Sequence, residues 1–307
     1  MNILVISSNL IGDSILSTGV IKYFIEKNPN SKLTIVVGPS AAQVYKNFPN
    51  LNNIIIVNKQ KFELHWLKIW KRCLFFKWDV IIDFRSSLIS FFLLRKRSYI
   101  FKHSYDDHQI HQLSNFFSLQ NTAYPFIFNN EIEEKIAKNK LLSGNKYIVV
   151  APGGNWSPKI WPIENFNKLI RVLSDSNKSI SIILVGSKNE KIRFKKDLIK
   201  NIDERKIIDL MGENITQTYS FIKRSNLFVG NDSGLMHLAA ASNISTIGLF
   251  GPTNDIIYAP FGDNCYTIRT KETYVDFNNT KMDINKSYMQ SIRIEDVLNL
   301  IKEKNLI

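Results

Sequence analysis

The fold is decided by GNDSGLMHLAAA at residues 230–241 and TIGLFGPT at residues 246–253. The first segment continues an apolar run at 227–229 into a tight polar turn, after which a helix of small residues is predicted from about Ser233. The second segment is another apolar run, and it ends in a Gly-Pro-Thr turn. Two successive strand-to-loop junctions of this kind are typical of the carboxyl edge of an open α/β sheet, where ligands bind. Because a helix that begins there offers free N–H groups to an anion, the pattern predicts a nucleotide-phosphate site.

The two junctions contain five candidate residues for that site: Asp232, Ser233, Gly234, His237 and Thr253. Ser233 and Gly234 stand where the helix is predicted to begin. Asp232 also fits the N-cap of this helix, a position that Asp often occupies. His237 lies one turn further along, where it fits either a phosphate donor or a packed core histidine. The residue types leave both interpretations open for Asp232 and His237.

Apolar runs alternate with helical patterns along the chain, which predicts parallel sheets with helices on both faces. In the first half, strands are expected at 3–6, 33–37, 54–57 and 80–83, and helices at 13–27, 41–48, 61–76 and 87–95. A charged helical stretch at 129–143 follows. In the second half, strands are expected at 147–151, 180–185, 207–210 and 227–229, and helices at 163–174, 189–200, 215–223 and 294–303. A loop-rich tail is expected between residues 260 and 291.

The two α/β series join near Gly144 and indicate two Rossmann-like domains facing a cleft, at residues 1–143 and 144–307. A length of 307 residues is enough for two domains of ordinary size. No apolar run reaches the roughly 20 residues that span a bilayer, and the first residues lack the pattern of a secretory signal. Because the chain has only two cysteines, Cys73 and Cys265, a reduced cytoplasmic protein is expected.

The first strand runs into SSNLIGDS at residues 7–14, which lacks the G-x-G-x-x-G spacing of a dinucleotide site. Gly12 permits a tight turn, and Asp13 follows at or just before the start of a helix. One interpretation is an N-cap, worth roughly 1 kcal/mol. The other is a general base at the carboxyl end of the first strand, where the helix dipole favours the ionised carboxylate.

The segment APGGNWSPKIWP at residues 151–162 opens the second half. Gly153 lets the backbone approach a ligand closely. Lys159 lies just before a helix predicted to start near Pro162 and is suited to neutralise a phosphate, although an ordinary surface lysine is the alternative. Asp209 ends a short predicted strand, a position from which an acid can hold ribose hydroxyls. Gly153, Lys159 and Asp209 therefore join the candidates.

The net charge of +13 is concentrated between Lys59 and Lys102, where eleven Lys and Arg residues against three acidic ones give a net charge of +8. Aromatic residues interleave with these cations: Phe62, Trp66, Trp70, Phe75, Phe76, Trp78, Phe91, Phe92, Tyr99 and Phe101. The combination suits an anionic membrane surface, an acidic lipid-linked substrate or nucleic acid. A solvated basic face beside ordinary core aromatics explains the same pattern.

Three segments together resemble glycosyltransferase family 9, the ADP-heptose:lipopolysaccharide heptosyltransferases. They are NILVI with GD at residues 2–13, PG with KIWP at 152–162, and NDSGLMH with FGPT at 231–253; WDVIIDFRS at 78–86 lies between the first two. The chain also has no Asp-x-Asp, a sequence used by glycosyltransferases that hold the sugar nucleotide through a metal ion.

The resemblance implies a GT-B fold and inverting transfer of a heptose from ADP-heptose to the inner core of lipopolysaccharide, with no required metal or cofactor. It implies that Asp13 is the general base and that Lys159 contacts the donor phosphates. The other residues assigned to donor binding lie at the ends of predicted strands, in the loops that follow them or at a helix start. They are Asp232, Ser233, Gly234, His237, Gly153, Asp209 and Thr253. Arg85 and Ser8 are assigned to the acceptor.

The expected partners are a nucleotide sugar, a lipopolysaccharide acceptor and the anionic inner face of the inner membrane, and not nucleic acid. In GT-B folds the last helix often returns to the first domain, which we expect of residues 294–303. Three other functions stay open: a transferase that uses another nucleotide sugar, a sugar-nucleotide epimerase or hydrolase on the same fold, and a non-catalytic nucleotide- or nucleic-acid-binding module.

Overall fold

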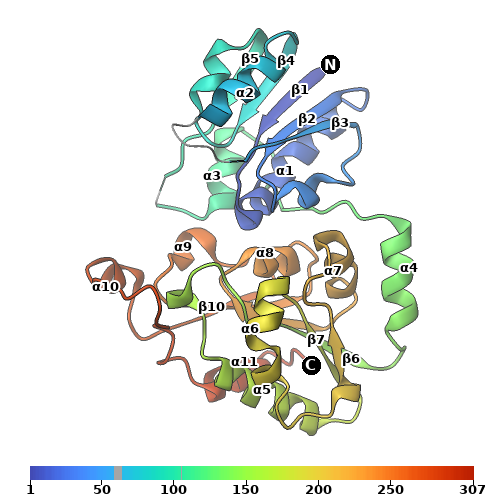
Figure 1. The fold of residues 1–307 in the computed structure, drawn as a ribbon, viewed down its shortest axis with the longest axis vertical. Coiled ribbons are helices and arrows are strands. Elements are labelled where there is room, and N and C mark those ends of the chain that lie inside the picture. Colours follow the sequence, from blue (N-terminus) through green and yellow to red (C-terminus); the bar gives the residue numbers. More distant parts are fainter. Residues whose placement is uncertain (59–63, 105) are drawn as a thin grey trace. The chain divides into compact units, whose positions relative to one another are not determined.

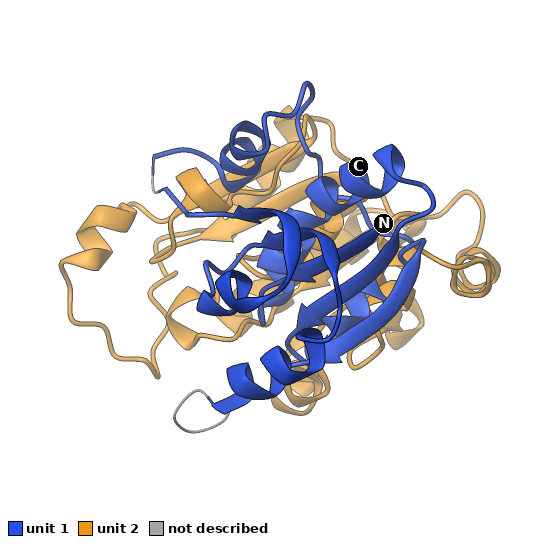
Figure 2. Ribbon diagram, turned by 90° about the horizontal axis from the view of Figure 1, so that it is seen from above, with its two compact units in different colours: residues 1–128 blue, residues 129–307 orange. Residues whose placement is uncertain are grey.

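The computed structural model describes residues 1–58, 64–104 and 106–307. The chain forms two compact units, residues 1–128 and residues 129–307, and each contains a parallel β-sheet (Figures 1 and 2). The charged stretch before the second sheet forms helix α4 (Glu131–Lys140). It packs on a helix of the second unit, where Glu134 pairs with Arg224 at 2.6 Å. The roles that the sequence assigns to the two halves stay predictions.

In the described part of unit 1, five parallel strands run in the order β3-β2-β1-β4-β5. Their bounds are β1 (Asn2–Ile6), β2 (Lys32–Val37), β3 (Leu51–Ile56), β4 (Trp78–Asp83) and β5 (Arg95–Ile100). The connecting helices are α1 (Ile11–Lys27), η1 (Ala42–Tyr45), α2 (Leu64–Cys73), η3 (Leu88–Phe92) and α3 (Gln109–Phe116). Central β1 pairs with β2 and β4, so that Ile6 lies opposite both Val36 and Asp83. The loop after β1 therefore starts beside the carboxyl ends of two neighbouring strands.

The core of unit 1 follows from the alternation of side chains along each strand. Leu4 and Ile6 of β1 and Val36 of β2 share one face of the sheet, and α2 covers it with Ile69 and Cys73. Removing each of these side chains from water contributes about 1.5–3 kcal/mol. The same packing fixes where the strands end, and with them the positions of the loops that carry Ser8, Asp13 and Arg85.

In unit 2, six described parallel strands run in the order β11-β10-β9-β6-β7-β8. Their bounds are β6 (Lys146–Ala151), β7 (Ile180–Leu184), β8 (Ile207–Asp209), β9 (Leu227–Asn231), β10 (Ser245–Phe250) and β11 (Cys265–Arg269). The further helices are η4 (Ser157–Lys159), α5 (Ile163–Ser176), α6 (Lys188–Leu198), η5 (Glu204–Lys206), α7 (Ile215–Ile222), α8 (Gly234–Ala240), α9 (Asp255–Tyr258), α10 (Tyr274–Asn278) and α11 (Ile294–Glu303). Last helix α11 contacts α5, and its residues Val297 and Ile301 lie in the core of this unit.

Two edge strands depart from the sequence expectation. The predicted helix at 87–95 is only the short η3, and the chain then forms β5. The tail expected to be loop-rich contains β11 and α10. Both strands are half-exposed at the border of a sheet, so neither shows the continuous apolar run of a buried parallel strand. The helix predicted at 61–76 is observed as α2, and residues 59–63, which include Phe62, lie outside the described residues.

Cys73 and Cys265 are both free thiols, in agreement with the expectation of reduced cysteines. Among the described helices, none combines the length and the apolar character that crossing a membrane requires.

Candidate functional site

The loop after β1 brings Ser8 and Asp13 together. Asp13 lies in the first turn of α1, whose N-cap is Leu10, so the N-cap interpretation of Asp13 is wrong. Gly12 likewise belongs to the helix and not to a turn before it. The Ser8 hydroxyl donates to Asp13 Oδ2 at 2.9 Å and accepts from the Leu10 amide at 3.1 Å. The half-buried carboxylate is thus held in one orientation near the positive end of α1.

A cluster of buried hydroxyl groups, contributed by Tyr45, Ser7 and Ser14, holds this loop in place. The Tyr45 hydroxyl lies 2.6 Å from Ser7 Oγ and donates to the Ser14 carbonyl at 3.2 Å. Burial raises the pKa of Tyr45 and outweighs its hydrogen bonds to Ser17 and Ser7, so the phenol stays neutral at physiological pH. Because a satisfied buried network is rigid, it fixes the backbone that carries Ser8 and Asp13.

The loop after β4 presents Arg85 at the same edge of the sheet. The fully buried Asp83 accepts from the Arg85 amide at 2.8 Å and from the Ser87 amide and hydroxyl at 2.9 and 2.6 Å. It also accepts from the Ser90 hydroxyl. The Arg85 guanidinium lies 5.3 Å from the centre of the Trp66 ring. Since Asp83 pairs with Ile6, the two loops that carry the predicted acceptor residues leave adjacent strands.

In unit 2, Lys159 and Asp232 form a largely buried ion pair. Lys159 Nζ lies 3.2 Å from Asp232 Oδ2, and the two side chains are 13% and 9% exposed. The N-cap of α8 is Ser233, so the interpretation of Asp232 as that cap is wrong, and so is that of Lys159 as an ordinary surface lysine. The structure therefore joins two predicted donor residues that are 73 positions apart in the sequence.

Asn231, which the sequence interpretation gave no role, positions this ion pair. Its buried side chain accepts from the Trp161 amide at 2.9 Å and donates to the carbonyls of Pro152 and Gly153 at 2.9 and 3.1 Å. These bonds tie the end of β9 to the segment that carries Lys159. The sequence feature that could have identified Asn231 is its polar amide side chain at the end of an apolar run that predicts a strand.

Two buried hydroxyls lie at the carboxyl ends of adjacent strands without a partner among the described residues. They are Ser233 Oγ, after β9, and Thr253 Oγ1, after β10. The two strands pair directly, with Leu249 opposite Asn231, and such strands are about 4.8 Å apart. Because buried polar groups in native proteins are nearly always hydrogen-bonded, two such hydroxyls indicate a place for a ligand. Gly234 and His237 belong to α8, which starts directly after Ser233.

Gly153 lies against the carboxylate of Glu190, the second residue that the sequence interpretation missed. A Cβ atom added at Gly153 would be 2.1 Å from Glu190 Oε1, so a larger residue there would require the Glu190 carboxylate to move. Glu190 and Ser187 form a capping box at the start of α6, in which Glu190 accepts from the Ser187 amide at 2.6 Å. The signal for this carboxylate was the sequence Ser-Lys-Asn-Glu after a predicted strand.

Asp209 stands apart from the other predicted donor residues. It ends the edge strand β8, three strand positions from β9, which corresponds to about 14 Å. Lys195 and Lys191 pair with its carboxylate at 2.7 and 3.0 Å. Burial alone would raise the pKa of Asp209, but the two ammonium groups and the Met211 amide outweigh burial and lower it. A role toward ribose stays a prediction.

This lowered pKa predicts how stability depends on pH. A carboxylate with a depressed folded-state pKa contributes stability above its unfolded value of about 3.9, and the contribution is lost as the pH falls below that value. Because the paired lysines are partly exposed, we expect Asp209→Asn to cost about 1 kcal/mol at pH 7. Urea unfolding at pH 7 and pH 3 measures this, and a difference that does not shrink at pH 3 would contradict it.

The sequence pattern of glycosyltransferase family 9 (heptosyltransferase) matches residues 127–288, more than half of the chain. The chain belongs to this family. Over 94% of each chain, this heptosyltransferase-family protein is 21% identical to lipopolysaccharide heptosyltransferase 3 of Escherichia coli.

Solved structures show that the family 9 chain has a GT-B fold of two Rossmann-like units. A glycosyltransferase family 9 protein from Veillonella parvula superposes with a TM-score of 0.77 at 18% identity, over 98% of this chain and 96% of that one. The E. coli heptosyltransferase WaaC with ADP gives 0.74 at 18% identity and 99% coverage of both chains. These matches confirm the fold class predicted from the sequence.

Proposed function

We propose that this protein transfers a heptose from ADP-heptose to the inner core of lipopolysaccharide, with residues 1–143 binding the acceptor and residues 144–307 the donor. One observation carries the donor half: two buried hydroxyls without a partner among the described residues, Ser233 Oγ and Thr253 Oγ1, follow the adjacent strands β9 and β10, and Ser233 comes directly after Asp232 of the ion pair. The relatives' names support the acceptor, and the solved structure of WaaC with ADP supports the nucleotide.

Lys159, Ser233 and Thr253 supply what a departing diphosphate needs. The lysine provides a positive charge that is already desolvated, and the hydroxyls provide hydrogen-bond donors that no described residue uses. Donors aimed at developing negative charge in a water-poor site stabilise the transition state without reorganising. Hydrogen bonds to charged groups contribute about 1.5–3 kcal/mol each.

Asp13 supplies the base for the acceptor. Its carboxylate takes the proton from an acceptor hydroxyl, and the resulting oxygen attacks the anomeric carbon on the face opposite the diphosphate. The new bond joins that carbon to the acceptor oxygen, while the bond to the phosphate oxygen breaks and ADP leaves with the electron pair. The transition state has oxocarbenium character, as in related glycosyl chemistry. Ser8 orients Asp13 through its 2.9 Å hydrogen bond.

We also propose that transfer requires no metal ion, which the resemblance implies and the absence of Asp-x-Asp from the sequence supports. A heptose-transfer assay in the presence of EDTA tests this. Undiminished turnover is the expected result, and loss of turnover that Mg²⁺ restores would overturn this part of the proposal.

The donor assignment is tested by heat stabilisation with ADP, UDP, GDP and CMP, because a ligand that binds only the folded state stabilises it. We expect a shift with ADP alone, worth about 2.7 kcal/mol at 100 times its dissociation constant. The double variant Ser233→Ala/Thr253→Val should lose most of this shift. Ser242→Ala is the matched control, because that hydroxyl is already bonded to the Ala239 carbonyl at 2.7 Å.

A shift with UDP or GDP instead of ADP would overturn the assignment of ADP-heptose as the donor. No shift with any of the nucleotides would overturn the assignment of the donor site. If ADP shifts the protein, a transfer assay with ADP-heptose and a heptose-deficient lipopolysaccharide follows. Donor incubated without acceptor is the control. Sugar released or epimerised at the transfer rate would support the epimerase or hydrolase in place of the transferase.

A further inference from the structure

Unit 1 exposes large apolar side chains on two adjacent helices, α2 and η3. On η3, Leu88 is 75% exposed, Phe91 56% and Phe92 67%, and on α2 Leu67 is 50% exposed. We call these residues, with Trp66 and Trp70, the α2–η3 surface. Several large apolar side chains exposed side by side are rare on soluble proteins. Such a patch marks a contact with another molecule or with a membrane.

The surface is a consequence of how the two helices pack. Helix α2 buries Ile69 and Cys73 against the sheet, the partly buried Trp70 packs at the border of the same cluster, and Leu67, two residues before Ile69, lies on the opposite, exposed side of the helix. In the 3₁₀-helix η3, Leu88 and Phe91 are three residues apart and so lie on one side. Trp70 Nε1 donates to the Phe92 carbonyl at 3.0 Å and holds the two helices together.

Between the helices lies a cavity of about 710 Å³, within the range of small-molecule sites. Its wall is mostly apolar, formed by Trp66, Leu67, Trp70, Leu88, Ile89 and Phe92. Arg85 supplies a cation in the lining, and its guanidinium lies over the Trp66 ring. An apolar wall with one cation suits a molecule that has an apolar part and an anionic group.

The flanks of the surface are basic. Lys68 and Lys71 on α2 are exposed, and the Arg95 guanidinium binds the Phe91 and Leu93 carbonyls at the end of η3. Among the described residues of the segment, 64–102, the acidic side chains do not offset this charge, because Asp83 is fully buried and Asp79 pairs with Lys96 at 2.6 Å. A second copy of the chain would bring like charges together, whereas an anionic lipid surface complements them.

We propose that the α2–η3 surface docks on a bilayer that contains anionic lipid, with Leu88, Phe91 and Phe92 among the acyl chains and Arg85 against lipid phosphate. Arg85 follows β4, whose Asp83 pairs with Ile6 of β1, so docking brings the edge that carries Ser8 and Asp13 toward the membrane. That second step rests on the proposed function, in which the acceptor is linked to a lipid.

Fluorescence quenching tests the contact directly, because Trp66 and Trp70 belong to the surface. The full-length protein is mixed with phosphatidylcholine vesicles that contain 30% phosphatidylglycerol and carry bromine on the acyl chains. We expect strong tryptophan quenching that the double variant Trp66→Phe/Trp70→Phe largely abolishes. Trp156→Phe, in unit 2, should keep the quenching. Equal quenching in both variants would overturn the assignment of the surface.

Vesicle sedimentation measures the contribution of individual side chains. Phe92→Glu should weaken binding at least tenfold, because it places a charge among acyl chains. Val275→Glu on α10 is the control, since Val275 is 64% exposed and Phe92 67%. Arg85→Gln should weaken binding about fivefold, the effect of one cation near an anionic membrane.

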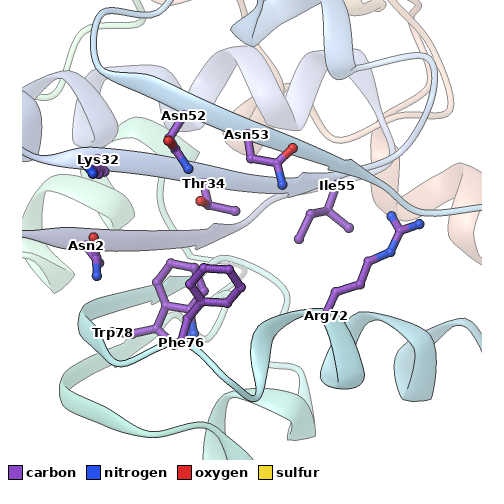
Figure 3. Close-up of a pocket in the computed structure, with 9 residues that line it drawn as sticks. All are labelled: Asn2, Lys32, Thr34, Asn52, Asn53, Ile55, Arg72, Phe76 and Trp78. Atoms are coloured by element: carbon purple, nitrogen blue, oxygen red, sulfur yellow. The ribbon is translucent and has the colours of Figure 1, made fainter.

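Lys32→Gln is the matched control for Arg85→Gln. Lys32 lines a second hollow of unit 1 together with Asn2 and Asn52, at the amino ends of the strands (Figure 3). Its removal should change binding less than about twofold, because the negative surface potential of the bilayer falls off within a Debye length. If Lys32→Gln weakens binding as much as Arg85→Gln, net charge and not this surface explains the binding.

Three further outcomes separate the alternatives. Equal binding to neutral vesicles, or full release by millimolar inorganic phosphate, would overturn the docking on anionic lipid. A dimer in lipid-free buffer that Phe92→Glu dissociates would assign the surface to a second copy of the chain. Circular dichroism melting checks that each variant folds. Because no donor or acceptor is present, vesicle binding and heptose transfer succeed or fail independently.

Discussion

Asp13→Asn should lower the turnover of heptose transfer by roughly 10²–10⁴-fold, the usual contribution of a general base. The amide has the shape of the carboxylate and can still accept the Ser8 hydrogen bond, but it cannot take a proton from the acceptor hydroxyl. Asp13 does not cap α1, so the substitution removes no cap and the fold should persist. Initial rates at saturating donor, with the ADP-induced heat shift measured in parallel, separate lost chemistry from lost binding.

Asp79→Asn is the control for this experiment. Asp79 also belongs to unit 1, but it lies near the amino end of β4 and pairs with Lys96, away from the loop that carries Asp13. Its replacement should leave turnover within about twofold, because surface ion pairs contribute little. If Asp13→Asn transfers heptose at a near-normal rate, Asp13 is not the base. If it loses the ADP shift as well, the substitution has disturbed more than the acceptor side.

The sequence predicted the strands that lie inside the two sheets because burial on both faces demands apolar runs, as at residues 3–6 and 147–151. It missed β5 and β11 for the converse reason. Both are edge strands, and β5 reads Arg-Lys-Arg-Ser-Tyr-Ile, a composition that favours no buried strand. Charged residues on an edge protect a sheet from pairing with another chain, and this also hides the strand in the sequence.

Single candidate residues were predictable where a loop follows a predicted strand, and their interactions were not. Asp13 and Asp232 both fitted an N-cap, and each lies one or more positions from the cap, because periodicity and capping residues locate a helix boundary only to within a few residues. The Lys159–Asp232 pair and the three hydrogen bonds of Asn231 join segments at least 70 residues apart. Contacts of this range leave no periodic signal in a single sequence.

The Lys159–Asp232 pair predicts the second large effect. Lys159→Met should lower the free energy of unfolding by about 3 kcal/mol, because it leaves a largely buried carboxylate without its counter-charge. It should also weaken ADP binding ten- to a hundredfold, since hydrogen bonds to charged groups contribute about 1.5–3 kcal/mol. Lys191→Met is the control: that lysine pairs with Asp209 from an exposed position, so its loss should cost less than about 1 kcal/mol.

A double variant separates the two roles of Lys159, in folding and in donor binding. In Lys159→Met/Asp232→Asn no buried charge remains unpaired, so most of the lost stability should return, whereas ADP binding should stay weak because no cation faces the diphosphate. Urea unfolding and calorimetric titration with ADP, carried out on the same protein preparations, measure both quantities. If the double variant recovers ADP affinity together with stability, Lys159 serves only to neutralise Asp232. If neither stability nor ADP affinity recovers, the ion pair is not the cause of the losses in Lys159→Met. The aliphatic part of the Lys159 side chain is then needed to pack the segment that Asn231 binds at the end of β9.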